Sequence, residues 1–164
     1  MIRSDVLSEE EFGEIVRCVP LISSDLIIRD PERKVLLGLR NHEPAKGYFF
    51  VPGGRIRKGE LLEEAFLRIL AAETGCRANF ESARFLGVYQ HMYANNRFGH
   101  PDFGTHYVVL AYELSLNRRP TVMLDSQHSV CEWMDEGDLK TRHTVHQFTK
   151  AYFQGIVTFG ACRP

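Results

Sequence analysis

The spacing of hydrophobic residues predicts one long helix near the middle of the chain. Residues 60–74 include no glycine or proline and are mostly good helix formers. Residues at spacings of four, three and four share one face of this helix: Leu62, Phe66, Ile69 and Glu73. Gly75 follows at the position where a left-handed residue commonly ends a helix. We therefore predict a helix over 60–74, with Glu73 in its last turn.

Short apolar runs on both sides of this helix predict strands. These runs, bounded by turn residues, are 19–29, 34–40, 49–51, 80–92, 105–116 and 130–134. Residues 30–33 have the composition of a turn, so the first two runs should form a hairpin. Residues 94–104 are polar and rich in asparagine and glycine, and we interpret them as a loop that could serve as a lid.

Two shorter helices complete the predicted elements. Ser8 followed by three glutamates is an N-cap signal for a helix that ends before Pro20, either a dimer arm or an ordinary terminal helix. Residues 144–153 predict a closing helix with Val145, Phe148, Ala151 and Tyr152 on one face. Since no repeat, low-complexity tract or linker interrupts the pattern, residues 1–164 should form a single mixed α+β domain.

Asp25 is an exception within an apolar run. Its neighbours include Leu21, Ile22, Leu26 and Ile27. A carboxylate at this position either faces solvent from an edge strand or lines a pocket, and the composition of the strand leaves both alternatives open.

Composition narrows the classes of function. The chain has 164 residues and a formal net charge of −1, which argues against binding nucleic acid through bulk charge. Its four cysteines are scattered, so neither a zinc site nor a disulfide framework is indicated. No apolar run has the length of a signal peptide or a membrane span. We therefore expect a cytoplasmic protein with reduced thiols and no membrane or nucleic-acid partner.

Residues 51–76, VPGGRIRKGELLEEAFLRILAAETGC, join the long helix to a glycine pair that allows positive φ and close approach of a ligand. This segment resembles the Nudix box. That pattern consists of a glycine, five residues, a glutamate, seven residues and then Arg-Glu-apolar-any-Glu-Glu-any-Gly-apolar. The residues that match in register are Gly54, Glu60, Arg68, Leu70, Glu73, Gly75 and Cys76. Ile69 and Ala72 replace two glutamates. Positions 69, 72 and 73 should line one pocket wall, where a single carboxylate remains.

Strings along nearly the whole chain resemble one branch of this superfamily, the GDP-mannose mannosyl hydrolases. In order they are PLISSDLII, LLGLR, GYFFVPGGR, FLRILAAETG, GVYQHMY, THYVVL, SQH, and VH followed by KAYF. The changes at Ile69 and Ala72 belong to that branch. The resemblance implies a Nudix fold, a mixed β-sheet sandwiched between helices, in a homodimer. It also implies hydrolysis of the nucleotide sugar GDP-mannose, and of GDP-glucose as a further candidate, at the anomeric carbon with inversion.

The reduced carboxylate set fits that chemistry. Attack of water on phosphorus usually needs several metal ions and a carboxylate base, which one glutamate cannot assemble. Breaking the bond between carbon and oxygen instead releases a nucleoside diphosphate, which one divalent cation and arginines can neutralise. A base must then deprotonate water on the opposite face of the sugar, as in inverting glycosidases.

The resemblance assigns the base and the metal ligands. His128 would be the base, because histidine transfers protons near neutral pH; without the resemblance, it would be interpreted as a surface histidine in a turn. The metal ligands would be Glu73, the side-chain oxygen of Gln127 and the backbone carbonyl of Gly53. Such an all-oxygen set suits Mg2+, with Mn2+ as a substitute.

The resemblance also assigns the groups around the substrate. Arg40, Arg55 and Tyr107 match positions that clamp the diphosphate, where guanidinium groups bind phosphate bidentately. Asp25 matches a catalytic residue close to the mannose. His91 matches a pocket residue that contacts or supports the sugar, although histidines on strands also serve in packing. Arg68 either binds substrate or, as we favour, forms an ion pair with Glu64 one turn earlier.

Two other functions remain open at this point. A conventional Nudix pyrophosphohydrolase would cleave the nucleotide sugar at phosphorus, giving GMP and a sugar phosphate. A module with a decayed box would bind nucleotides without turnover. The presence of Glu73, Gln127 and His128 together argues against this last alternative.

Overall fold

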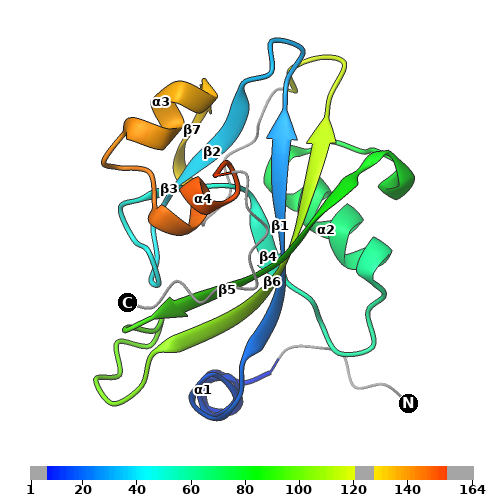
Figure 1. Ribbon diagram of the computed structural model, residues 1–164. Coiled ribbons are helices and arrows are strands. Elements are labelled where there is room, and N and C mark those ends of the chain that lie inside the picture. Colours follow the sequence, from blue (N-terminus) through cyan, green and yellow to red (C-terminus); the bar gives the residue numbers. More distant parts are fainter. Residues whose placement is uncertain (1–6, 121–127, 155–164) are drawn as a thin grey trace.

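The computed structural model describes residues 7–120 and 128–154, and only the backbone of residues 128 and 129. Its strands are β1 Leu21–Arg29, β2 Val35–Arg40, β3 Phe49–Phe50, β4 Gly53–Arg55, β5 Arg84–Tyr93, β6 Thr105–Ser115 and β7 His128–Met134. They form one mixed sheet (Figure 1) in the order β3–β2–β1–β6–β5, while β4 pairs with β1 and β7 with β2. The pairing of β1 with β6 is parallel. This arrangement places β1 at the centre of the sheet.

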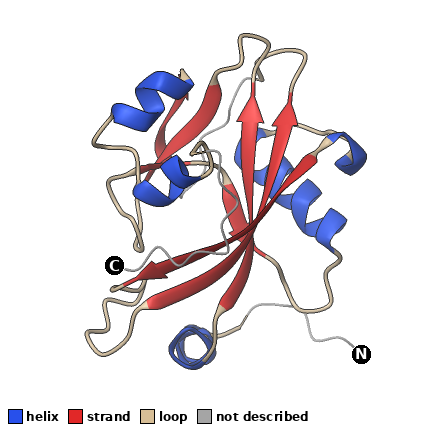
Figure 2. Cartoon of the chain, in the orientation of Figure 1, coloured by secondary structure: helices blue, strands red, loops and turns tan. Residues whose placement is uncertain are grey.

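Helices lie on both sides of the sheet (Figure 2). They are α1 Glu9–Cys18, α2 Leu62–Thr74, α3 Glu136–Thr141 and α4 Gln147–Ala151, with a 3-10 turn, η1, at Phe80–Ser82. In the figure, α2 lies on one side of the strands, α3 and α4 on the other, and α1 at one end. The predicted α+β class, a mixed sheet between helices, is confirmed. Among the described residues, no helix is long and apolar enough to cross a membrane.

The core has two layers because strand residues alternate between the faces of the sheet. Leu26 and Ile28 of β1 pack with Phe66 of α2 in one layer. Ile27, between them, packs in the other layer with Phe148 of α4 and with Val35 and Leu37 of β2. A central strand that is buried on both faces has an almost continuous apolar run, which is what residues 26–28 show.

The predicted hairpin is confirmed only at its end. β1 and β2 pair at Arg29 and Val35. Further back along β1, Ser23, Ser24 and Asp25 pair instead with β4. The neighbour of β1 therefore changes from β2 to β4 at the position where Asp25 interrupts the apolar run.

The helix ends agree with the predictions in part. In α1, Glu11 N–H donates to Ser8 Oγ at 3.2 Å and Ser8 N–H donates to Glu11 Oε2 at 2.8 Å, which caps the helix as expected. Gly75 ends α2 with a φ of 68°. The predicted start of α2 at residue 60 was wrong, because the helix begins at Leu62. Leu62 was also predicted on the apolar face of the helix, but its side chain is 46% exposed.

The closing segment was predicted less well. Val145 forms a bridge with Phe49, so α4 begins only at Gln147, and α3 was not predicted. The predicted strand over 80–92 was also too long, because η1 takes its first residues. These elements are short, and short helices have weak periodic signals.

Candidate functional site

The glycine pair lies in β4, not in a turn. Neither glycine has a positive φ, so that expectation was wrong, but both allow close approaches. A Cβ on Gly53 would lie 3.1 Å from Asp25 Cγ and closer still to its Oδ1. A Cβ on Gly54 would lie 3.1 Å from Ile69 Cγ1. The pair therefore lets β4 approach the Asp25 carboxylate on one side and α2 on the other.

Asp25 lies at the centre of the sheet with a buried side chain. It is 7% exposed, and its Oδ2 accepts a hydrogen bond of 2.6 Å from the Tyr152 hydroxyl. Of the two alternatives for Asp25, the solvent-facing edge strand is excluded, because β1 has β6 on one side and β4 on the other.

Two other charged groups act on Asp25. Burial raises its pKa to about 6, and the hydrogen bond from Tyr152 and the Arg40 guanidinium only partly oppose this effect. The Glu73 carboxylate raises the pKa further. Arg40 and Glu73 therefore lie within electrostatic reach of Asp25, although they come from β2 and α2. A carboxyl with a pKa raised towards neutrality is a common property of active sites.

His91 lies on the other side of the same tyrosine. Its Nε2 is 3.1 Å from the Tyr152 hydroxyl, and its ring stacks on Phe148 with centroids 4.4 Å apart. Burial, His146 and Arg40 lower its pKa to about 3, so the imidazole is neutral. Because the Tyr152 proton points to Asp25, we assign the Nε2–H tautomer, which donates to the hydroxyl oxygen. This agrees with the packing and hydrogen-bonding role expected of a strand histidine.

Tyr152 was missed as a site residue. It was predicted to lie on the core face of the closing segment, and it is 8% exposed there. Its hydroxyl joins Asp25 of β1 to His91 of β5. A tyrosine on a core face needs a partner for its hydroxyl, which is the only sequence signal that could have indicated this role.

Arg40 and His128 are brought together by the sheet. They form a register pair between β2 and β7. His128 is therefore the first residue of a strand, and its predicted place in a turn was wrong. Gln127 lies outside the described residues.

Tyr107 lies among the arginines predicted to clamp a diphosphate. Burial raises the pKa of Tyr107, and the guanidinium groups of Arg40, Arg55 and Arg97 oppose this shift. Tyr107 also forms a register pair with His91 across β5 and β6. The strands thus gather Tyr107, Arg40 and Arg55 from three different parts of the sequence.

The two box arginines have different surroundings. Arg68 donates from Nε to Glu60 Oε1 at 2.6 Å and from Nη2 to Glu60 Oε2 at 2.9 Å. The favoured ion pair thus exists, but its partner is not Glu64, which accepts from Leu61 N–H at 2.9 Å. Arg55 instead lies over the Phe12 ring, with Cζ 3.7 Å from the centroid.

The donor set near Asp25 fits a single divalent cation. Glu73 is 7% exposed, whereas Ile69, 2% exposed, packs in the α2 core layer. Ala72 is exposed, so the prediction that it shares the pocket wall was wrong. The box therefore buries one carboxylate, Glu73, within electrostatic reach of Asp25. Mg2+ commonly takes one or two carboxylates and completes its octahedron with water and phosphate oxygens. Among the described residues, no three His, Cys, Asp or Glu side chains form a metal-binding group.

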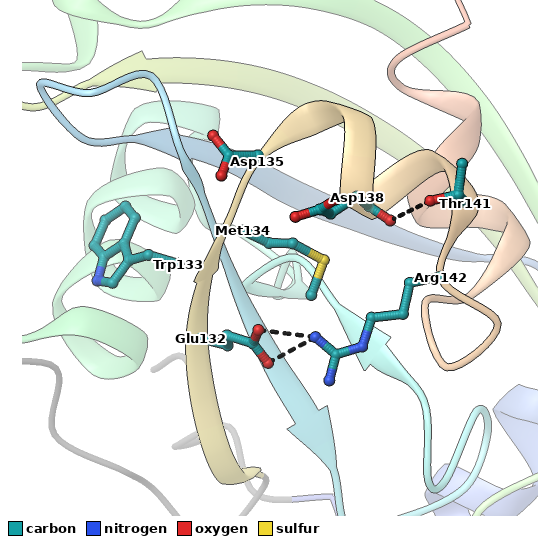
Figure 3. Close-up of a pocket in the computed structure, with 7 residues that line it drawn as sticks. All are labelled: Glu132, Trp133, Met134, Asp135, Asp138, Thr141 and Arg142. Atoms are coloured by element: carbon teal, nitrogen blue, oxygen red, sulfur yellow. Dashed lines mark hydrogen bonds and ion pairs between the residues drawn. The ribbon is translucent and has the colours of Figure 1, made fainter.

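A separate pocket lies between β7 and α3 (Figure 3). Its volume is about 320 Å3, and its lining consists of Glu132, Trp133, Met134, Asp135, Asp138, Thr141 and Arg142. Glu132 accepts two hydrogen bonds from Arg142 Nη1, at 2.8 and 2.9 Å. No predicted site residue lines this pocket, so we place the candidate site at Asp25.

Comparisons with known proteins identify the family of the chain. The model of the NUDIX domain matches residues 20–154. Over 123 residues the chain is 40% identical to the low-salt glycan biosynthesis protein Agl8 of Haloferax volcanii, covering 75% of this chain and 76% of that protein. Over 70 residues it is 41% identical to the ADP-ribose pyrophosphatase of Methanocaldococcus jannaschii, covering 43% and 40%.

The fold is also similar to that of solved structures. A MutT NUDIX hydrolase from Burkholderia pseudomallei superposes with a TM-score of 0.69 at 23% identity, covering 84% of this chain and 98% of that one. At this identity the likeness concerns the fold alone, and it confirms the predicted Nudix fold.

Proposed function

The chain belongs to the Nudix family, and we propose that it hydrolyses the nucleotide sugar GDP-mannose, with GDP-glucose as a further candidate substrate. Water attacks the anomeric carbon and the products are GDP and free sugar, with inversion. One observation carries the proposal: Ile69 is packed in the core and Ala72 is exposed, so Glu73 is the one carboxylate that the end of α2 directs towards Asp25. That set is too small for the metal cluster of phosphoryl attack.

The name of one relative supports a sugar-nucleotide substrate. Agl8 is a glycan biosynthesis protein, and glycan synthesis consumes activated sugars. The name of the other relative, an ADP-ribose pyrophosphatase, favours the alternative, cleavage at phosphorus to GMP and a sugar phosphate. The alignment with Agl8 covers 75% of the chain and that with the pyrophosphatase covers 43%.

In the proposed reaction His128 is the base that takes a proton from the attacking water. Asp25 accepts hydrogen bonds from the sugar and stabilises the positive charge that develops as the bond to the leaving oxygen breaks. Arg40, Arg55 and Tyr107 bind the diphosphate, and His91 supports the sugar side of the site through Tyr152. Arg68, held by Glu60, keeps β4 in place.

Glu73, Gln127 and the Gly53 carbonyl would hold Mg2+, or Mn2+ as a substitute, which supplies positive charge to the departing diphosphate. We further propose a homodimer in the cytoplasm, with residues 1–164 of each chain forming one domain.

Hydrolysis in water labelled with oxygen-18 tests the position of bond cleavage. With Mg2+ and GDP-mannose, we expect the label in free mannose and none in GDP. Label in GMP or in mannose 1-phosphate would overturn the proposal in favour of the pyrophosphohydrolase. A parallel assay with GDP-glucose, read as free glucose, establishes whether it is also a substrate.

Replacing the base gives an independent test. His128→Gln should reduce kcat by roughly a hundredfold or more, since a positioned base contributes about 10^2 to 10^4. Affinity for Mg2+ should change little, because the imidazole is not in the proposed ligand set. The matched control is His143→Gln at an exposed position after α3, which should retain activity. Equal turnover in the two variants would remove His128 from this role.

A further inference from the structure

The loop between β5 and β6 has a fixed conformation. Its centre is Asn96, which is 1% exposed. The Asn96 amide donates to the carbonyls of His100 and Phe103 at 2.8 and 2.7 Å. Its Oδ1 accepts from the N–H groups of Phe98 and His100 at 2.9 and 3.2 Å. Four hydrogen bonds satisfy this side chain completely, so the residues next to Asn96 are held in one arrangement relative to each other.

Arg97, the next residue, is directed to α1. Its Cζ lies 5.8 Å from the centroid of the Phe12 ring and 5.7 Å from that of Phe98. Phe12 and Phe98 themselves pack edge to face with centroids 5.6 Å apart. Arg55 uses the same Phe12 ring, with Cζ 3.7 Å from the centroid. One aromatic ring thus holds two guanidinium groups from distant segments, since aromatic faces attract cations.

Positive charge accumulates at this ring without a neutralising carboxylate in the part of the chain that the structure describes. Partial burial lowers the pKa of Arg55, and the cations Arg97, Arg57 and Arg68 lower it further. Neither Arg55 nor Arg97 forms an ion pair with a described residue, whereas Arg68 is paired with Glu60. Like charges brought together on a rigid support favour binding of an anion, which relieves their repulsion.

We propose that Arg97 and Arg55, both resting on Phe12, form a two-arginine phosphate site that binds the diphosphate of the nucleotide-sugar substrate. The inference rests on the proposed function for the identity of that substrate. It adds Arg97, and with it the loop over 94–104 and helix α1, to a clamp that otherwise consists of Arg40, Arg55 and Tyr107.

The position of Tyr107 connects this site to the reaction centre. Arg40, Arg55 and Arg97 all act on the Tyr107 hydroxyl, and so does Asp25. A phosphate group beside Tyr107 would therefore lie within reach of three guanidinium groups. Guanidinium groups bind phosphate oxygens through pairs of parallel N–H bonds, and the Phe12 ring excludes water from one side of Arg55.

Binding of small anions tests the site directly. Inorganic pyrophosphate and GDP are titrated into the protein with Mg2+ by calorimetry. For Arg97→Gln we expect the affinity for both ligands to fall by about tenfold, the effect of losing one charged hydrogen-bonding partner. Arg97→Lys keeps the charge but loses the planar fork, and should recover only part of the affinity.

The control removes the same charge elsewhere. Arg77 is exposed, follows α2 and is not among the groups that act on Arg55 or Tyr107. Arg77→Gln should bind both ligands within about twofold of the wild type, as expected for a distant exposed charge. Equal affinities for Arg97→Gln and Arg77→Gln would overturn the inference. So would a loss for GDP but not for pyrophosphate, because Arg97 would then contact the nucleoside.

Product analysis separates this inference from the proposed function. If the wild type releases no free sugar but Arg97→Gln still loses affinity for pyrophosphate, the phosphate site stands and the glycosyl hydrolase fails. If free mannose is released and KM for GDP-mannose is the same in Arg97→Gln and Arg77→Gln, the glycosyl hydrolase stands and the phosphate site fails. For the site as proposed, KM rises in Arg97→Gln by more than kcat falls.

Discussion

Charged residues are arranged differently at the candidate site and in the ion pairs outside it, which we call peripheral. Among the peripheral pairs, Arg29 at the end of β1 donates to Glu113 at 2.7 Å and to Glu136 at 3.0 Å, and Arg68 of α2 is paired with Glu60. At the site, Asp25 lies within electrostatic reach of the Glu73 carboxylate, and Arg55 within reach of the Arg97 and Arg57 guanidinium groups. Opposite charges are thus paired where they join elements of the fold, whereas at the site like charges lie within reach of one another, although Arg40 also acts on Asp25.

This contrast indicates which substitutions should affect stability and which should affect activity. Groups that repel one another in the folded chain destabilise it until a ligand binds, so the site should become more stable when one of them is removed. Groups that are paired at the periphery should behave in the opposite way. Four substitutions test this comparison.

Asp25→Asn should have the largest effect on turnover. We expect kcat to fall by about 10^2 or more, the scale of losing one electrostatic contact to the transition state. In EDTA at pH above 7, the free energy of unfolding should rise by about 1 to 3 kcal/mol. The folded pKa of Asp25, about 6, is above the ordinary 3.8. The protonated carboxyl therefore contributes to the free energy of unfolding fully below pH 3.8, and this contribution is lost as pH rises through 6.

Urea denaturation and steady-state kinetics measure the two quantities. The control is Asp102→Asn in the exposed part of the loop, which should leave stability within about 0.5 kcal/mol. A less stable Asp25→Asn protein would contradict the view that the site carries uncompensated repulsion.

Tyr152→Phe should have the next largest effect. Loss of the hydroxyl leaves Asp25 Oδ2 and His91 Nε2 without their common partner, which should cost about 1 to 3 kcal/mol of stability. Because Asp25 is then less well oriented, kcat should fall by about tenfold. Tyr89→Phe is the matched control, since Tyr89 packs edge to face against Tyr152 with centroids 4.7 Å apart. If Tyr152→Phe and Tyr89→Phe had the same stability and the same kcat, Tyr152 would act by packing alone.

Arg68→Ala should mainly reduce stability. The guanidinium joins Glu60 to the carbonyl of Arg55, so its loss should lower the free energy of unfolding by about 1 to 2 kcal/mol. The affinity for GDP should change by less than about threefold, in contrast to Arg97→Gln, because Arg68 is already neutralised. A larger loss of GDP affinity, measured by calorimetry on folded protein, would move Arg68 from the periphery to the substrate.

His91→Gln should have the smallest effect near neutral pH, where the imidazole is mostly neutral in both the folded and the unfolded chain, and its effect should appear in the pH dependence of stability. Its folded pKa is about 3, below the ordinary 6.5, so the unfolded chain takes up a proton first as pH falls. The stability that neutral His91 contributes is complete above 6.5 and is lost towards pH 3. The variant should therefore lose stability less steeply in this window, by at most about 1.4 kcal/mol per pH unit. Parallel curves for variant and wild type would place His91 in a more polar setting.

The local pattern was sufficient for the long elements of the fold. Helix α2 and strands β1, β2, β5 and β6 repeat their period over enough residues to be recognised, and the Nudix box located Glu73 and the glycine pair. The same pattern missed β4 and α3, which are three and six residues long. It also placed His128 in a turn, because the pairing of β7 with β2 involves residues about 90 positions apart in the chain.

Local sequence patterns were sufficient to identify the Nudix family, the α+β class and the box helix with its single buried carboxylate, and the family resemblance supplied the candidate site residues. Three features became visible in the folded chain alone: Tyr152 joins Asp25 to His91, Glu60 rather than Glu64 neutralises Arg68, and Arg97 and Arg55 both lie against the Phe12 ring. The reason is physical: periodicity and spacing report on neighbours along one element. Hydrogen bonds and charge contacts between distant segments depend on how the sheet brings those segments together.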